Sequence, residues 1–281
     1  MGTADSVADA LAASVDALTA AGVESPRLDA ELMLAEATGT DRARLIAEPG
    51  AALEPPASRA FGAMVRRRLR REPVAYILGR RWFRDIELRV DHRVLIPRPE
   101  TELLVEVALE LEPRRALDVG TGSGAVALAL AAELPAAEVV ATDSSPEALQ
   151  VARENAARLG LAERVGFAAG TLPSQGGFDL LLANLPYVAD GDWPQLAPEI
   201  RDWEPRRALL GGRDGLDALR ALLADLREPQ AAARPYTAAV ALEVGAGQAD
   251  AVAAMLADAG FPLTETRDDL AGIGRVVLGR R

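Results

Sequence analysis

From Arg115 onward, short apolar segments alternate with longer segments that have helical spacing, and this alternation limits the possible folds more than any other feature. The segments that predict strands lie at 115–119, 138–142, 164–168, 178–183 and 237–244. The segments that predict helices lie at 124–133, 145–159, 214–227 and 247–259. Such alternation is typical of a doubly wound α/β domain with a mostly parallel sheet. Two further segments, 262–265 and 275–278, predict a closing hairpin.

Residues 1–75 show no strand pattern and predict a small all-helical domain. The expected helices run from 6 to 21, from Pro26 onward, from the cap Asp41 to Ile46, and from the cap Ser58 to Arg71. Residues 76–97 contain the alternating pattern of a β-hairpin, with expected strand segments at 82–83, 86–90 and 94–96, and we interpret this region as a linker. A helix over 100–111 then leads into the main domain, which we expect to span 98–281.

The residue types present exclude several kinds of chemistry. The 281-residue chain has no cysteine, which excludes disulfides, thiolate zinc sites and a cysteine nucleophile. Its single histidine, His92, lies at a predicted hairpin turn and is given no role. One histidine argues against a histidine metal site and against a Ser-His-Asp triad, so we expect no metal.

Charge and hydropathy indicate the class of partner and the location. The formal net charge is −11, so the overall field of the protein does not favour nucleic acid. The first ten residues have no basic region like that of a signal peptide, and no run of eighteen apolar residues occurs. We therefore expect a cytoplasmic protein with no membrane association.

A glycine-rich turn follows the first strand of the main domain. The sequence Asp118-Val119-Gly120-Thr121-Gly122-Ser123-Gly124 lets the backbone turn sharply and lets a ligand approach the main chain closely. Asp143 follows about twenty residues later, where a carboxylate can accept both hydroxyls of a ribose. The predicted cofactor-binding residues are Gly120, Thr121, Gly122, Ser123, Gly124 and Asp143. The turn alone leaves a dinucleotide and S-adenosylmethionine both open.

A second loop, Asn184-Leu185-Pro186-Tyr187, follows the strand at 178–183. The Asn184 side-chain oxygen and the Leu185 main-chain oxygen can accept the two N–H bonds of a planar amide or amine. Pro186 stiffens the loop, and Tyr187 can stack on the flat acceptor group. A loop of this kind beside the glycine turn predicts methyl transfer from S-adenosylmethionine to nitrogen. The sulfonium carries the positive charge, so the reaction needs no metal. The predicted catalytic residues are Asn184, Pro186 and Tyr187.

Several strings of residues resemble one family along nearly the whole chain. The matching strings are 72–79, 95–102, 118–124, 203–206, 212–216, 243–245 and 269–272. The most specific of them contains Ile-Pro-Arg-Pro-Glu-Thr-Glu, at 96–102. The chain resembles the HemK/PrmC-type protein-(glutamine-N5) methyltransferases, which modify peptide chain release factors. The resemblance implies a helical N-terminal domain, a β-hairpin linker and a seven-stranded, Rossmann-like methyltransferase domain.

The resemblance also implies roles for the two loops. It implies that Gly120 to Gly124, Asp143 and Asn184 contact S-adenosylmethionine, and that residues 184–187 hold the glutamine of a Gly-Gly-Gln segment. The chain departs from the family at Leu185, where a proline is usual, but the accepting carbonyl belongs to the main chain and survives the change. Gly170 and Thr171 stand where the family often has an Asp-Trp pair beside the adenine. Thr171 is kept as the cofactor-binding candidate there.

Two other functions remain open at this point. Adenine-N6 methyltransferases acting on RNA or DNA use a similar Asn-x-Pro-aromatic loop, although the charge of −11 opposes that reading. A non-catalytic protein that keeps the fold is the second, and the intact Asp118, Gly120, Asp143 and Asn184 argue against it.

Eight arginines between Arg66 and Arg84 predict either a solvated face or a surface for an anionic partner.

Overall fold

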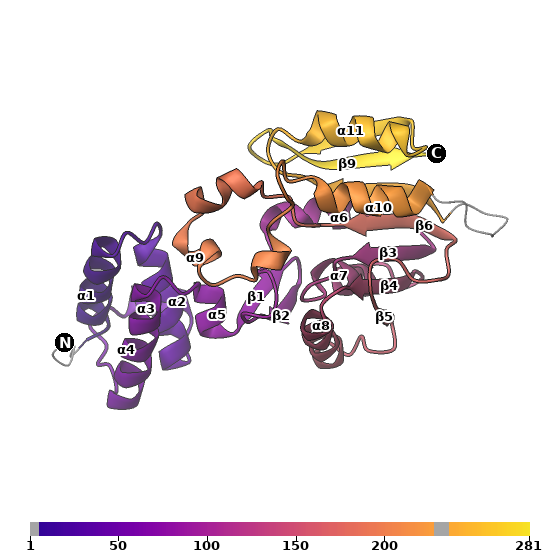
Figure 1. Cartoon of the computed structure of the whole chain (residues 1–281). Coiled ribbons are helices and arrows are strands. Elements are labelled where there is room, and N and C mark those ends of the chain that lie inside the picture. Colours follow the sequence, from indigo (N-terminus) through magenta and orange to yellow (C-terminus); the bar gives the residue numbers. More distant parts are fainter. Residues whose placement is uncertain (1–5, 228–235) are drawn as a thin grey trace. The chain divides into compact units, whose positions relative to one another are not determined.

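A computed structural model describes residues 6–227 and 236–281 of the chain (Figure 1). The chain divides into two compact units. The smaller unit contains the residues up to Gly79 together with Ala197–Trp203, and the larger contains Arg80–Leu196 and Glu204–Arg281. The segment Ala197–Trp203 therefore leaves the larger unit, joins the helical one and returns.

The smaller unit is helical. Its helices are α1 (Val7–Ala20), α2 (Pro26–Thr38), α3 (Arg42–Ala47), α4 (Pro55–Leu69), α5 (Val74–Leu78) and α9 (Pro198–Arg201). Leu18, Met33, Leu34 and Val65 are completely buried between α1, α2 and α4. The predicted cap at Ser58 is wrong, because α4 begins three residues earlier, at Pro55. A proline has a backbone angle already suited to the first turn of a helix, where no N–H needs a partner.

Part of the arginine-rich segment forms ion pairs inside the helical unit. The Arg68 side chain is only 7% exposed and lies 2.7 Å from Asp29 and 2.8 Å from Glu199. Arg71 also reaches Glu199, at 2.7 Å, and Arg67 is paired with Glu72. The charges of these three arginines are thus balanced by acids of the same unit, and Arg68 is buried among them.

The larger unit is built on a seven-stranded sheet with the order β5-β4-β3-β6-β7-β9-β8. The strands are β3 (Arg115–Val119), β4 (Glu138–Asp143), β5 (Val165–Ala169), β6 (Phe178–Ala183), β7 (Thr237–Glu243), β8 (Leu263–Asp268) and β9 (Gly274–Arg280). The first five are parallel, whereas β9 runs antiparallel to β7 and β8. The predicted α/β class and the closing hairpin agree with this sheet.

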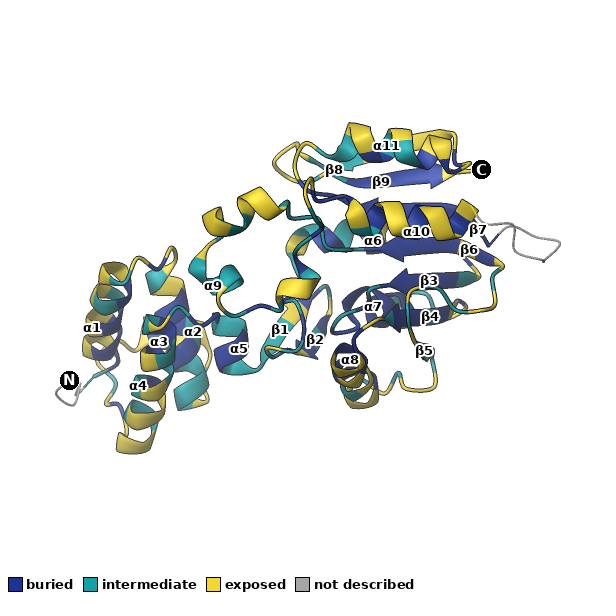
Figure 2. Cartoon of the chain, viewed as in Figure 1, coloured by how far each residue is buried: buried dark blue, intermediate teal, exposed yellow. Residues whose placement is uncertain are grey.

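Helices cover both faces of the sheet because successive strand residues point to opposite sides. On β6, Leu180 and Leu182 pack in one core cluster with α6 (Glu102–Leu111) and α7 (Ala125–Glu133). The intervening Leu181 packs in another with α10 (Asp217–Arg227) and α11 (Ala249–Asp258). Figure 2 shows the consequence at α10, which is buried on its inner side and exposed on its outer side. Helix α8 (Pro146–Arg158) contributes to the same core cluster as α6 and α7.

The hairpin of β1 (Arg80–Phe83) and β2 (Ile86–Arg89) belongs to the larger unit. Phe83 and Leu88 are buried in its core. The predicted strand at 94–96 does not form. Instead, the main-chain N–H of Ile96 donates a 3.0 Å hydrogen bond to the buried Glu204 carboxylate. The helix expected from residue 100 starts as a short 3-10 turn, η1 (Pro99–Thr101), before α6.

Across the described residues, no helix has the length and apolar character needed to span a membrane.

Candidate active site

Three loops that carry the predicted site residues leave the sheet side by side. Strand β3 pairs in parallel with β4 on one side and with β6 on the other, and Val119 is in register with both Thr142 and Ala183. The carboxyl ends of the three strands therefore coincide, which places Gly120, Asp143 and Asn184 at one edge. The sequence correctly predicted that the glycine turn and the asparagine loop meet.

Gly120 lies close to the asparagine loop. Its backbone has φ +76°, a left-handed conformation that favours glycine. A Cβ atom there would lie 2.9 Å from Leu185 Cδ2 and 3.6 Å from the Asn184 carbonyl oxygen. A side chain at this position would therefore force the Leu185 side chain to shift.

The rest of the turn is held in a shape that suits a nucleotide cofactor. The Gly122 N–H donates to Asp143 Oδ2 at 2.9 Å, and the Ser145 N–H donates to Oδ1 at 2.8 Å. A Cβ at Gly122 would have only the Gly120 carbonyl oxygen nearby, at 4.0 Å, so a ligand has room beside this part of the main chain. Each carboxylate oxygen of Asp143 can accept a further hydrogen bond, such as one from a ribose hydroxyl. These residues fit S-adenosylmethionine.

Buried polar side chains support the turn from inside the protein. Asp118 Oδ2 accepts hydrogen bonds from Thr121 Oγ1, at 2.7 Å, and from the Ala127 N–H, at 3.2 Å. Burial raises the pKa of Asp118 to about 6. Asn155, on α8, donates to the Ser123 carbonyl oxygen at 2.9 Å and also to that of Arg89. Asn155 was not predicted from the sequence, although an asparagine on the buried face of a helix indicates a hydrogen bond inside the protein.

Thr171 contributes a main-chain hydrogen bond to this edge of the sheet. Its carbonyl oxygen accepts a 2.7 Å hydrogen bond from Thr142 Oγ1, next to the end of β4. Its side chain is exposed. This places Thr171 near Asp143 at the same sheet edge.

The asparagine loop is held on both sides. Asn184 Nδ2 donates to Thr101 Oγ1 at 3.0 Å. The Tyr187 carbonyl oxygen accepts from Gln248 Nε2 at 3.0 Å. A Cβ at Gly211 or Gly215 would collide with the carbonyl oxygens of Pro186 and Tyr187, respectively, so the segment 211–215 packs directly on the loop. The loop is thus fixed in place without the proline that the related family usually has at position 185.

One ionisable group belongs to this loop and another lies beside it. Burial raises the pKa of the Tyr187 phenol to about 12, so the phenol stays neutral. Burial likewise raises the pKa of Glu243, the last residue of β7, to about 7. Within the described part of the chain, the structure brings no three metal-ligating side chains together as a metal site.

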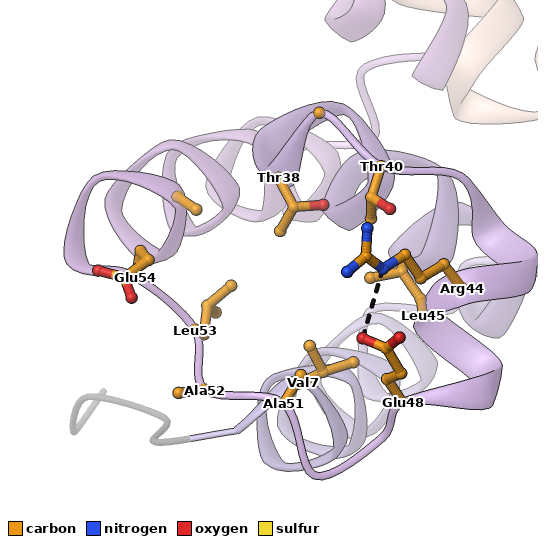
Figure 3. A pocket seen from close by; sticks show the side chains of 12 residues that line it. Val7, Thr38, Thr40, Arg44, Leu45, Glu48, Ala51, Ala52, Leu53 and Glu54 are labelled. Carbon is orange, nitrogen blue, oxygen red and sulfur yellow. Dashed lines mark hydrogen bonds and ion pairs between the residues drawn. The ribbon is translucent and has the colours of Figure 1, made fainter.

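A hollow elsewhere in the molecule contains none of the predicted site residues. It measures about 360 Å³ and lies in the helical unit, lined by parts of residues 38–57 and by Val7 (Figure 3). Arg44 and Glu48 are hydrogen-bonded at its edge. It is separate from the three loops described above, which all belong to the larger unit.

Comparison with known proteins decides the family. Residues 9–79 match the PrmC N-terminal domain, and residues 116–203 match a methyltransferase domain. A release factor glutamine methyltransferase from Cereibacter sphaeroides is 44% identical, and the alignment covers 97% of this chain and 98% of that protein. One from Deinococcus radiodurans is 42% identical with the same coverage. The chain belongs to the release factor glutamine methyltransferase family. This membership confirms the predicted resemblance, enzyme class and cofactor, S-adenosylmethionine.

A solved structure supports the fold independently. The catalytic domain of hMettl16, in complex with MAT2A 3'UTR hairpin 6, superposes with a TM-score of 0.55 at 14% identity. The match covers 82% of this chain and 84% of that one. At this identity the likeness concerns the fold alone, and it agrees with the predicted α/β fold.

Proposed function

We propose that this chain transfers the methyl group of S-adenosylmethionine to the side-chain amide nitrogen, N5, of the glutamine in the Gly-Gly-Gln segment of peptide chain release factors. This modification would support translation termination. The observation that carries the proposal is the orientation of Asn184. Its Nδ2 donates to Thr101, so its Oδ1 is left to accept a hydrogen bond from another group.

The chemistry explains why such an acceptor is useful. An amide nitrogen is a poor nucleophile because its lone pair is shared with the carbonyl group. Asn184 Oδ1 and the Leu185 main-chain oxygen would accept the two N–H bonds and hold the nitrogen in a reactive orientation. Pro186 would keep the loop rigid and Tyr187 would pack on the glutamine side chain. When bound, S-adenosylmethionine supplies the electrophilic methyl group.

The cofactor would lie along the glycine turn. Gly120, Thr121, Gly122, Ser123 and Gly124 would line its path with main-chain atoms, and Asp143 would accept the ribose hydroxyls. The Gly122–Asp143 hydrogen bond supports this assignment because it keeps the carboxylate facing the turn. Asn184 would contact the cofactor as well as the substrate. Thr171 stays a candidate at the adenine.

The partner is proposed to be the release factor protein itself. We propose that residues 1–75 recognise it, that 76–97 connect the two functions, and that 98–281 perform the chemistry. Direct binding of nucleic acid is not part of this proposal, since the net charge is −11 and Arg67, Arg68 and Arg71 are paired within the helical unit. Location in the cytoplasm remains a prediction from the sequence.

A direct assay tests the function. Labelled methyl transfer from S-adenosylmethionine would be measured with purified release factor, with ribosomal RNA and with DNA under identical conditions. We expect label only in the release factor, and peptide mapping should place a single methyl group on the glutamine of Gly-Gly-Gln. Label on an adenine amine of the RNA or DNA, without label in the protein, would instead identify an adenine-N6 methyltransferase.

A further inference from the structure

Asn184 is the outermost of three hydrogen-bonded side chains that reach into the protein. Its Nδ2 donates to Thr101 Oγ1 at 3.0 Å, and the Thr101 side chain is hydrogen-bonded to the Glu243 carboxyl group. Thr101 is 5% exposed and Glu243 only 1%. Strands β6 and β7 are parallel neighbours, and Ala183 is in register with Leu242. The next residues along the chain, Asn184 and Glu243, therefore stand next to each other at the edge of the sheet.

The direction of these bonds decides what Asn184 presents to a substrate. The two ends of an asparagine amide have nearly the same shape, so the bonding partner determines which end faces inward. A threonine hydroxyl has one hydrogen. If that hydrogen is donated to an ionised Glu243, Thr101 can only accept from Asn184, and it therefore selects Nδ2.

We propose that Thr101 and Glu243 are positioning residues that fix which way round the Asn184 amide lies, and so keep its oxygen turned toward the substrate amide. This inference rests on the proposed role of Asn184. A protonated Glu243 could donate to Thr101 instead. The Thr101 hydroxyl would then be free to donate to the Asn184 oxygen, and the amide would turn its NH₂ group, which cannot accept a hydrogen bond, toward the substrate.

The surroundings of Glu243 make this switch accessible near neutral pH. Burial is the main cause that raises its pKa to about 7, and the neighbouring Glu100 raises it further. Thr101, Arg275 and Arg98 lower it, and the neutral Tyr187 phenol lies nearby. Among the described residues, Glu243 Oε2 has no hydrogen-bond partner, which disfavours the ionised form. Turnover should therefore fall as the pH drops through about 7, where the carboxyl group takes up a proton.

Two substitutions at Thr101 separate orientation from packing. Thr101→Val keeps the shape and removes the hydroxyl, whereas Thr101→Ser keeps the hydroxyl. We expect Thr101→Val to lower kcat by about tenfold or more, as for the loss of an ordinary hydrogen bond, while the Kd for S-adenosylmethionine stays within about twofold. Thr101→Ser should retain most of the activity. Equal losses in both variants would overturn the proposal in favour of a packing role.

The pH profile and a double variant test the coupling itself. The fall in kcat near pH 7 should disappear in Glu243→Gln and in Thr101→Val. In an Asn184→Ala background, adding Thr101→Val should not lower kcat any further. A full additional loss would mean that Thr101 does not act through Asn184.

A measurement without substrate distinguishes failure of this inference from failure of the proposed function. The ¹⁵N signal of the Asn184 side-chain amide, assigned by its loss in Asn184→Ala, should shift with an apparent pKa of about 7 in the wild-type chain. The shift should be absent in Thr101→Val. A signal that does not titrate between pH 6 and 8 would overturn the coupling, whether or not the release factor is a substrate.

Discussion

The Gly122 N–H donates a 2.9 Å hydrogen bond to the Asp143 carboxylate, so the end of β4 and the glycine turn after β3 hold each other in place. The same carboxylate accepts from Ser145 on its other oxygen. A ligand lying along the turn would meet a carboxylate that is already oriented.

This arrangement predicts that Asp143→Ala weakens S-adenosylmethionine binding by about 1.5–3 kcal/mol, the range for a lost hydrogen bond to a charged group. Isothermal titration calorimetry checks the value directly. Glu163→Ala, which removes an exposed carboxylate outside the three loops, is the matched control and should bind normally. Unchanged affinity in Asp143→Ala would remove Asp143 from the cofactor site.

Gly120→Ala should impair both cofactor binding and turnover. Gly160→Ala is a close control, because Gly160 has φ +72° and no atom within 4 Å of an added Cβ, whereas the Cβ at Gly120 would meet Leu185 at 2.9 Å. Both changes force a side chain into the left-handed region, at about 1–2 kcal/mol. Only Gly120→Ala should also reduce the rate. Equal rates in the two variants would show that contact between the turn and the loop is unimportant.

Arg68→Ala should destabilise the helical unit by about 3–5 kcal/mol, because it leaves the Asp29 carboxylate without its buried partner, whereas Glu199 keeps Arg71. Urea unfolding followed by circular dichroism measures the loss. Arg220→Ala breaks an exposed ion pair with Asp214 and should change stability little. A loss at Arg68 no larger than that at Arg220 would contradict the assigned role of this buried cluster.

The buried Asp118 predicts a pH dependence of stability. Its pKa is raised to about 6 from an ordinary value of 3.8, so the folded protein holds this proton more tightly than the unfolded chain. The stabilisation from this group is thus complete below about pH 4 and is lost as the pH rises through 6. Asp118→Asn keeps a side-chain oxygen for Thr121 and Ala127 but does not titrate. Its melting temperature, relative to wild type, should therefore increase between pH 4 and pH 8. A constant difference would mean that Asp118 is not titrating as described.

Patterns within a segment predicted much of this fold. Strands β3 and β6 have the predicted bounds, because each consists mainly of apolar residues that are buried on both faces of the sheet. The strand at 94–96 was predicted wrongly because alternation cannot reveal that Ile96 finds its partner in Glu204, more than a hundred residues away. The cap at Ser58 was wrong for a local reason, the strong preference of Pro55 for the first helical turn.

The site was predictable only in part for the same reason. The glycine turn, Asp143 and Asn184 stand at strand ends, and the parallel sheet brings strand ends together without further information. The hydrogen-bonded chain through Thr101 and Glu243, and the support from Asn155, depend on contacts between segments far apart in the sequence. The binding of Ala197–Trp203 to the helical unit through Glu199 likewise has no signature in its own seven residues.

The most direct test of the account is the rate at which Asn184→Ala methylates the glutamine of the Gly-Gly-Gln segment, measured by mass spectrometry of a purified release factor. Removing one preoriented hydrogen-bonding group from an active site typically costs about 10²–10³ in rate. We predict a loss of that size, with a native circular dichroism spectrum. Methylation of that glutamine at the wild-type rate would contradict the mechanism.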